Sequence, residues 1–208
     1  MGEGSDGIII INPNIKEVEF PVIIHAVFDL VDFEVYGDKL LQLVEYLGHN
    51  EVIVHPVSEK APVNANTQNL LLEQVKRFSQ KAKTKGIVWY LENNSAIDKF
   101  HYKKEELSAI YREDNYVEQL LDIAHIDHYK HLEAIISVKF PKCLHVAGKH
   151  FDVAHEHLPL TQGDIDYKLV FQKYLRGYDG KIILEVDGSD EEIKQSKQII
   201  DEAILFIK

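Results

Sequence analysis

Short apolar runs alternate along the chain with longer segments whose apolar positions recur at helical spacing. Most of the short runs are nearly continuous in isoleucine, valine and leucine, which is typical of parallel strands covered on both faces. The predicted strands are Gly7–Ile11, Val22–Val27, Glu51–His55, Gly86–Glu92, Gln119–Ala124, Lys142–Ala147 and Lys181–Val186. The predicted helices are Asp38–Gly48, Asn66–Lys85, Lys103–Glu113, Asp127–Val138, Ile165–Leu175 and Ser189–Ile207.

This alternation predicts an α/β fold with a parallel sheet and right-handed crossovers. No linker rich in proline, glycine or serine divides the chain, so residues 1–208 are predicted to form a single domain. A closed (β/α) barrel of TIM type normally has about eight strand–helix units in roughly 250 residues. The chain has 208 residues. We therefore expect a short barrel of TIM type, which either lacks the first strand–helix unit or compresses the early strands around Asn12–Phe20.

The charge balance narrows the classes of partner. Lys and Arg number 23 against 34 Asp and Glu, which gives a formal net charge of −11. Proteins that bind nucleic acid normally present a basic face, so DNA is not expected as a partner. The single cysteine, Cys143, excludes an internal disulfide. The first residues have no basic region and Ile8–Ile11 is far too short for a membrane span, so the protein is predicted to be cytoplasmic with no membrane partner.

Polar side chains recur where the predicted strands end. In parallel α/β folds these ends meet on one face, which is where functional sites lie. Two further histidines follow the sixth predicted strand closely. The residues that we expect to gather on this face are His25, His55, Glu92, Asp122, His125, His145, His155, His157 and Glu185.

Taken singly, each of these residues has an ordinary explanation. His25 or His55 could be a hydrogen-bonded core histidine, and Asp122 and His125 could form a simple pair at a strand end. Glu185 is harder to explain in this way, because a carboxylate that ends a buried strand needs a partner. The joint arrangement favours a functional site over separate structural roles.

Six other polar residues are interpreted without a metal-binding role. Lys149 and His150 are close to the site in sequence and are predicted to contact substrate, although an ordinary loop role explains them equally well. The remaining histidines lie in helical or polar segments and are interpreted as surface residues. They are His49, His101, His128 and His131.

Imidazole and carboxylate donors without cysteine indicate a divalent ion such as Zn²⁺ in the first place, or Mn²⁺ or Co²⁺. Nine candidate ligands exceed what one four-coordinate ion needs. They suffice for two or three ions bridged by Glu92 or Glu185, and such clusters activate water and clamp a phosphoryl group. Alternatively, one ion held by Glu92, Asp122, His145 and Glu185 would polarise a carbonyl while the two glutamates move a proton between carbons.

The order of these short motifs resembles the xylose isomerase-like barrel superfamily, which includes endonuclease IV and the sugar isomerases and epimerases. The resemblance runs over roughly residues 22–187. Each motif is short, and the ordered set is what makes the resemblance specific. The motifs are Ile24–Ala26, Val52–Pro56, Leu91–Asn93, Leu121–His125, Leu144–Val146, His157–Asp166, Gly177–Gly180 and Leu184–Glu185.

The resemblance implies roles for individual positions. Eight of the nine expected ligands match metal ligands of the endonuclease IV type, and His155 stands where that pattern has an aspartate. In the isomerase and epimerase branch, Glu92, Asp122, His145 and Glu185 would hold one ion, with Glu92 and Glu185 as the acid/base pair.

Three functions follow from these observations. The first is an enzyme with one to three divalent ions that acts on a phosphoester or a phosphorylated sugar, and His25 and His55 favour a count of two or three. The second is a single-metal sugar isomerase or epimerase, which the acidic charge favours over a DNA enzyme. The third is a non-catalytic ligand-binding barrel. A short, open barrel would leave an edge for another subunit to cover, so a homo-oligomer is a further expectation.

Overall fold

The computed structural model describes residues 22–112 and 116–205. The predicted strand Gly7–Ile11 lies outside this part of the chain. The described strands are β1 (Ile24–Asp29), β2 (Glu51–Val57), β3 (Val88–Glu92), β4 (Glu118–Asp122), β5 (Cys143–Val146) and β6 (Lys181–Leu184). The helices are α1 (Phe33–Leu47), α2 (Thr67–Lys85), α3 (Lys104–Tyr111), α4 (Tyr129–Ile136), α5 (Tyr167–Leu169) and α6 (Asp190–Ile204).

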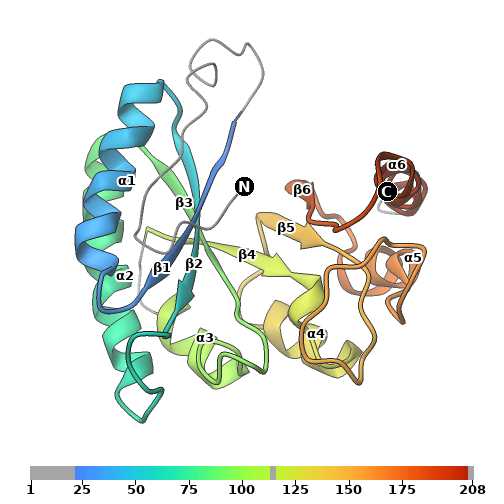
Figure 1. Ribbon diagram of the computed structural model, residues 1–208, viewed down its shortest axis with the longest axis horizontal. Helices are drawn as coiled ribbons and strands as arrows, with labels where there is room; N and C mark the ends of the chain where they lie inside the picture. The colour runs from blue at the N-terminus through green and yellow to red at the C-terminus, as the bar shows by residue number, and fades with distance from the viewer. Residues whose placement is uncertain (1–21, 113–115, 206–208) are drawn as a thin grey trace.

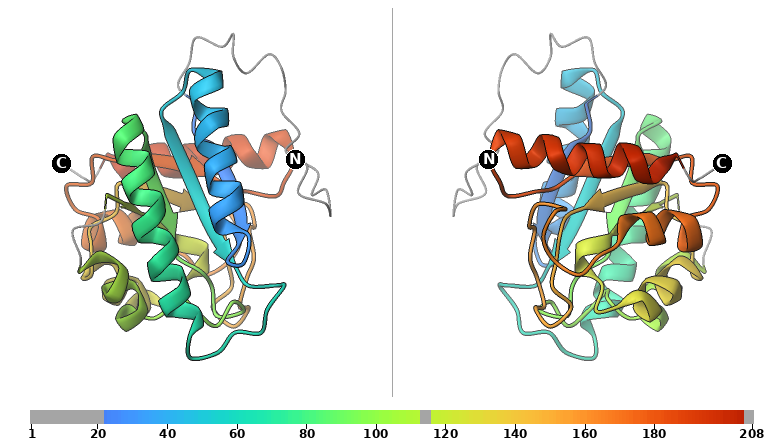
Figure 2. Two further views of the ribbon diagram at one scale, coloured as in Figure 1. Left: turned by 90° about the vertical axis from the view of Figure 1, so that its left-hand side faces the viewer. Right: turned by 90° about the vertical axis from the view of Figure 1, so that its right-hand side faces the viewer.

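The sheet contains six parallel strands in the order β1-β2-β3-β4-β5-β6. The strands curl into a half-barrel, with the helices on the outer face (Figures 1 and 2). The curl brings Lys181 Nζ at the start of β6 to 2.9 Å from Glu51 Oε2 at the start of β2. This confirms the α/β class, the parallel barrel-type sheet and the expectation of a shortened barrel.

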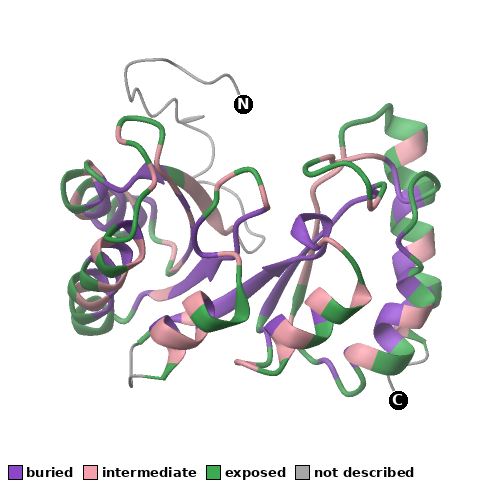
Figure 3. Cartoon of the chain, turned by 90° about the horizontal axis from the view of Figure 1, so that it is seen from below, coloured by how far each residue is buried: buried purple, intermediate pink, exposed green. Residues whose placement is uncertain are grey.

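Two apolar clusters hold the helices against the sheet. One packs α1 and α2 on β1–β3 around residues such as Leu41, Val75 and Trp89. The other packs α4 and α6 on β4–β6, with Leu144 and Ile200 among its members. The central strands are accordingly the most buried part of the molecule, while the outer helix faces are exposed (Figure 3).

Helix α1 begins at Phe33, five residues before the predicted start at Asp38. Gly37, just before the predicted start, is a poor helix former. In the structure this glycine lies at a helix–helix contact, where a Cβ atom would come within 2.9 Å of the Phe78 ring. Close packing of α1 on α2 therefore overrides the local propensity.

Among the described residues, β1 pairs only with β2 and β6 only with β5. The two ends of the curled sheet are thus not joined to each other in this part of the chain. No helix within residues 22–112 and 116–205 has the length and apolar character needed to cross a membrane.

Candidate functional site

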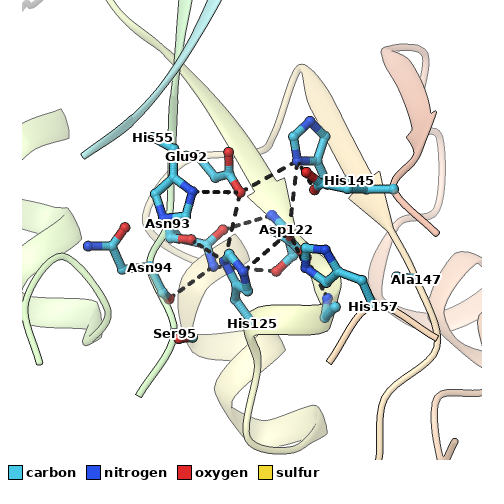
Figure 4. Close-up of polar contacts among 12 residues, drawn as sticks. His55, Glu92, Asn93, Asn94, Ser95, Asp122, His125, His145, Ala147 and His157 are labelled. Carbon is cyan, nitrogen blue, oxygen red and sulfur yellow. Dashed lines mark hydrogen bonds and ion pairs between the residues drawn. The ribbon is translucent and has the colours of Figure 1, made fainter. Parts of the chain in front are cut away.

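The carboxylate of Glu92, at the end of β3, is the centre of a ring of imidazoles (Figure 4). Its Oε1 atom lies 3.7 Å from His55 Nδ1, 3.5 Å from His145 Nδ1 and 3.8 Å from His125 Nδ1. Its Oε2 atom lies 3.2 Å from His25 Nε2. The Glu92 residue is only 1% exposed, so these contacts form in a protected interior.

Asp122, at the end of β4, is the second central carboxylate. Its Oδ1 atom accepts a 2.7 Å hydrogen bond from the Ala124 amide, which fixes the side chain. Its Oδ2 atom is thereby directed at His125 Nε2, His157 Nε2 and His145 Nδ1, at 3.5, 3.6 and 3.8 Å.

His145 lies opposite Asp122 in the register of β4 and β5. Its Nδ1 atom is 2.6 Å from Glu185 Oε2, one residue past the end of β6. The Glu185 amide donates to the Val146 carbonyl at 3.1 Å, which continues the β5–β6 pairing and holds Glu185 beside His145. Four successive strands, β3 to β6, therefore each deliver one donor to the same place.

Asn93 is not one of the converging donors, but it holds two of the residues that carry them in place. Its side-chain oxygen accepts from the Asp122 amide at 2.9 Å, which ties the end of β3 to the end of β4. Its carbonyl oxygen lies 2.8 Å from His125 Nδ1. A carbonyl can only accept, so Nδ1 of His125 carries a proton and Nε2 is the ring nitrogen that faces Asp122.

The loop after β5 carries His155 and His157 back over the strand ends. Gly148 and Leu158 exchange two backbone hydrogen bonds of 2.7 and 2.9 Å, which close the loop. A Cβ atom on Gly148 would come within 2.4 Å of the Pro159 carbonyl oxygen, so only glycine fits there. The ring centroids of His155 and His157 are 4.8 Å apart, and His155 is 4.9 Å from the ring of His125.

Electrostatics keep the two central carboxylates ionised. Burial favours the neutral form of Glu92, but the surrounding imidazoles, His55 first among them, hold the pKa of its carboxyl well below the usual range. Burial likewise opposes ionisation of Asp122, and His125 with its neighbours keeps the pKa of that carboxyl low. The pKa of His145 is raised despite its burial, because the carboxylates of Asp122, Glu185 and Glu92 lie around its Nδ1 atom.

These residues fit divalent metal ions. Two ligands of a tetrahedral ion with bonds of about 2.0–2.2 Å are roughly 3.4 Å apart, and the nitrogen–oxygen distances around Glu92 and Asp122 mostly fall near that value. Most are too long for good hydrogen bonds. Buried polar atoms without a partner normally require an ion or water. Those with no hydrogen-bond partner at this site are His25 Nε2, His55 Nε2, Glu92 Oε2, Asp122 Oδ2, His125 Nε2, His145 Nδ1, His157 Nε2 and Glu185 Oε2.

Within the described residues, three groups of donor atoms are close enough together to hold an ion. Each group offers one atom per residue, and all atoms of a group lie within 4.8 Å of one another. The groups are Glu92–Asp122–His145–Glu185, His25–Glu92–His145 and His125–His155–His157. The structure thus brings together all nine side chains that the sequence singled out as ligands, His55 joining through its contact with Glu92.

The two residues predicted to contact substrate lie in different settings. Lys149 is buried, and its Nζ atom donates a 2.5 Å hydrogen bond to the Ile126 carbonyl. Burial lowers the pKa of this ammonium. His150 is exposed, and its Nδ1 atom lies 3.0 Å from Glu156 Oε2. A role for either residue in substrate binding stays a prediction.

The interpretation of His101 and His131 as surface residues is wrong. His101 is fully buried, and neither ring nitrogen has a hydrogen-bond partner. The side chain of His131 is 10% exposed, and its Nε2 atom lies 2.9 Å from the Tyr102 carbonyl. His101 has a positive φ of 50° in the loop after β3, so its burial follows from how that loop turns inward and leaves no periodic signal in the sequence.

The buried His101 is expected to make the protein labile to acid. Burial lowers the pKa of its imidazole from 6.5 to about 3. Between these values the unfolded chain binds a proton that the folded chain does not. The free energy of unfolding should therefore fall with pH across this window, by up to about 1.4 kcal/mol per pH unit from this residue.

Urea unfolding of chelator-treated protein at pH 7 and pH 4.5 measures the effect. His101→Gln should lose less stability on acidification than the wild type, whereas His150→Gln, at an exposed position, should behave like the wild type. Equal losses for all three proteins would contradict the assignment to His101.

Comparison with known sequences places most of the chain in one family. The sequence model described as xylose isomerase-like TIM barrel matches residues 36–208. Among curated proteins, none is similar enough in sequence to count as a match.

Solved structures share the fold at low sequence identity. A D-tagatose 3-epimerase-like protein has a TM-score of 0.75 at 20% identity, with 94% of this chain and 84% of that chain covered. Endonuclease IV from Thermus thermophilus has a TM-score of 0.61 at 22% identity, with 89% and 76% covered. A xylose isomerase-like TIM barrel protein from Mycobacterium smegmatis, in complex with magnesium, has a TM-score of 0.61 at 17% identity, with 86% and 74% covered. The Mycobacterium smegmatis structure contains magnesium, and another solved structure of this fold has a bound zinc atom.

Proposed function

We propose that this chain, which belongs to the xylose isomerase-like TIM barrel family, is a divalent-metal-dependent hydrolase. Its site would hold at least two ions, and its substrate would be a phosphoester or a phosphorylated sugar. One observation carries this proposal. Eight buried nitrogen and oxygen atoms, one from each of eight side chains at one end of the strands, converge without forming hydrogen bonds of good geometry, and the shortest contact among them is the 2.6 Å between His145 Nδ1 and Glu185 Oε2. A single four-coordinate ion would leave several of them unsatisfied.

The division of ligands between the first two ions follows from the contacts. Glu92, Asp122, His145 and Glu185 form one complete set of four donors. His145 presents a single nitrogen, Nδ1, to this set, so it serves one ion only. His25 and His55 then remain for a second ion, with Glu92 shared between the two, because its two oxygens face different imidazoles.

Ions held at these positions would polarise a phosphoryl oxygen and activate a water molecule for in-line displacement at phosphorus. The chain's own residues would keep the centre rigid and charged. Asn93 orients His125, and the Ala124 amide orients Asp122. The low pKa values of Glu92 and Asp122 keep both carboxylates ionised at neutral pH. With a net charge of −11, the rest of the surface favours a small phosphoester over a DNA duplex.

A single-metal sugar isomerase or epimerase is the second candidate, and one observation favours it. The set of Glu92, Asp122, His145 and Glu185 is complete in itself. Glu185 is also the more accessible of the two glutamates, with a side chain 30% exposed against 1% for Glu92. In this reaction Glu92 and Glu185 would exchange a proton with opposite faces of a substrate carbon. The candidate leaves His25, His55 and His157 without a role.

Metal content and activity together separate the two candidates. Protein loaded with Zn²⁺ and desalted should contain two or more ions per chain by elemental analysis, and should hydrolyse an activated phosphodiester such as bis(4-nitrophenyl) phosphate or a sugar phosphate. One ion per chain, together with interconversion of ketoses and no release of phosphate or nitrophenol, would overturn the hydrolase and establish the isomerase. Repeating the assays with Mn²⁺ and Co²⁺ tests the preference for zinc.

A further inference from the structure

The loop after β3 contains two buried polar side chains that the candidate metal ligands do not account for. Asn94 and His101 are both 0% exposed. Neither amide atom of Asn94 and neither ring nitrogen of His101 has a hydrogen-bond partner among the described residues. Buried polar groups are nearly always hydrogen-bonded, because it is costly to lose a bond to water without replacing it. Four such atoms in one loop therefore indicate partners that are not protein groups.

The backbone of this loop holds Asn94 and His101 together. The Asn94 amide donates to the His101 carbonyl at 3.0 Å, which closes the loop between them. The His101 amide donates to Gln68 Oε1 at 3.1 Å, which anchors the end of the loop to α2. Lys99 and His101 have positive φ angles of 63° and 50°, which residues other than glycine rarely adopt. Strained backbone of this kind is concentrated at functional sites.

The candidate metal ligand beside this loop is His55, in β2. Burial lowers the pKa of His101, and the His55 imidazole lowers it further, so the two rings lie within range of each other's charge. The Asn94 side chain lies on the same side of Glu92 as the ring of His55 (Figure 4). The loop therefore borders the candidate metal centre at His55.

His55 needs a partner for one of its two ring nitrogens. Its Nδ1 atom lies 3.7 Å from Glu92 Oε1, and its Nε2 atom is buried. A histidine that binds a metal uses one nitrogen, and the hydrogen bond of the other fixes its tautomer and its ring orientation. The Asn93 carbonyl serves His125 in this way. In the described part of the chain, no protein group hydrogen-bonds to His55 Nε2.

We propose that Asn94 and His101 are positioning residues for His55, and that they act through ordered water held between the three side chains. A buried water molecule normally makes about three hydrogen bonds. The amide of Asn94 offers donors and an acceptor, and each neutral imidazole offers one of each. This inference rests on the proposed function in taking His55 as a metal ligand. It adds two residues that contact neither the metal nor the substrate.

The first test determines the tautomer of His55 without any metal. Nitrogen-15 NMR of the histidine side chains in metal-free protein shows which ring nitrogen carries the proton. We expect a single tautomer in the wild type and a mixture in Asn94→Leu and in His101→Leu, because apolar side chains cannot hold the water. Asn94→Ser and His101→Gln keep polar atoms and should restore the single tautomer.

The second test measures zinc affinity by competition with a chromophoric chelator. Asn94→Leu and His101→Leu should bind the ion at His55 about tenfold to a hundredfold more weakly. The ion held by the set of four donors that includes Glu185 should keep its affinity.

Gln119→Leu is the matched control for the loss of a buried amide. Gln119 is fully buried in β4, and its amide also lacks partners among the described residues. Because side chains alternate along a strand, this amide points to the opposite face of the sheet from Asp122. The variant should leave the tautomer of His55 and both zinc affinities unchanged. The melting temperature of each metal-free variant shows whether it is folded.

A crystal structure of the metal-free wild type completes the test without any variant. It should show an ordered water within hydrogen-bond distance of His55 Nε2 and of a polar atom of Asn94 or His101. No water there, or a single His55 tautomer in every folded variant, would overturn the inference, while two zinc ions per chain would leave the proposed function standing. Fewer than two ions in a wild type that shows the water and the tautomer changes would overturn the proposed function instead.

Discussion

Replacing Glu92 with glutamine is expected to lower phosphodiester hydrolysis by roughly a hundredfold to a thousandfold and to reduce the zinc content of the protein. The substitution keeps the shape of the side chain and removes the charge that His25, His55 and His145 surround. An amide offers one weak oxygen where the carboxylate offers two charged ones, so it cannot bridge two ions. Turnover of bis(4-nitrophenyl) phosphate and elemental analysis on the same sample measure both effects.

Glu73→Gln is the matched control, because Glu73 is an exposed residue of α2. It should leave the metal count and turnover at wild-type values. The metal-free Glu92→Gln protein should remain folded, since glutamine occupies nearly the same volume. A Glu92→Gln variant that keeps its full zinc content and its full rate would exclude Glu92 as a bridging ligand.

The convergence of these side chains could be predicted from the sequence, because parallel strands bring their carboxyl ends together. Parallel strands end on one face, so Glu92, Asp122, His145 and Glu185 had to meet once their strands were recognised. Their register then follows from strand pairing alone, as in the contact of Asp122 with its β5 partner His145. The supporting contacts follow no such rule. Asn93 ties β3 to β4 through its own side chain, and nothing in its sequence position distinguishes it from an ordinary loop asparagine.

The strands and helices of the fold could also be predicted from the sequence, whereas contacts that depend on packing could not. Apolar runs identified the strands, and helical periodicity identified the helices between them. The predicted start of α1 was five residues late, and the close approach of Gly37 to Phe78 between the two helices is a property of the packed state. The degree of curl depends on contacts between distant strands, such as Lys181 with Glu51. Short-range patterns carry no information about such pairs. The sequence therefore predicted a short barrel but not which strands form the edges of its sheet.

Removing the metal ions should lower the melting temperature sharply. An ion that binds only the folded chain stabilises it by about 4 kcal/mol when its free concentration is a thousand times the dissociation constant. For a chain of this size, that corresponds to a fall of roughly 10 °C on removal of one ion. Without the ions, buried atoms such as Glu92 Oε2 and Asp122 Oδ2 are left without partners, and like-charged carboxylates face one another.

The measurement is a thermal melt of zinc-loaded protein with and without excess chelator, with the metal content of each sample verified. The control for solvent effects is chelator that has been saturated with calcium beforehand. It should lower the melting temperature less than free chelator does, by an amount set by its residual affinity for zinc. Adding back Zn²⁺ should restore the transition, and the Glu92→Gln variant should respond less than the wild type because it has a weaker site. A melting temperature that stays the same after proven loss of every ion would mean that the converging histidines and carboxylates are satisfied without metal, and the multi-ion site would have to be abandoned.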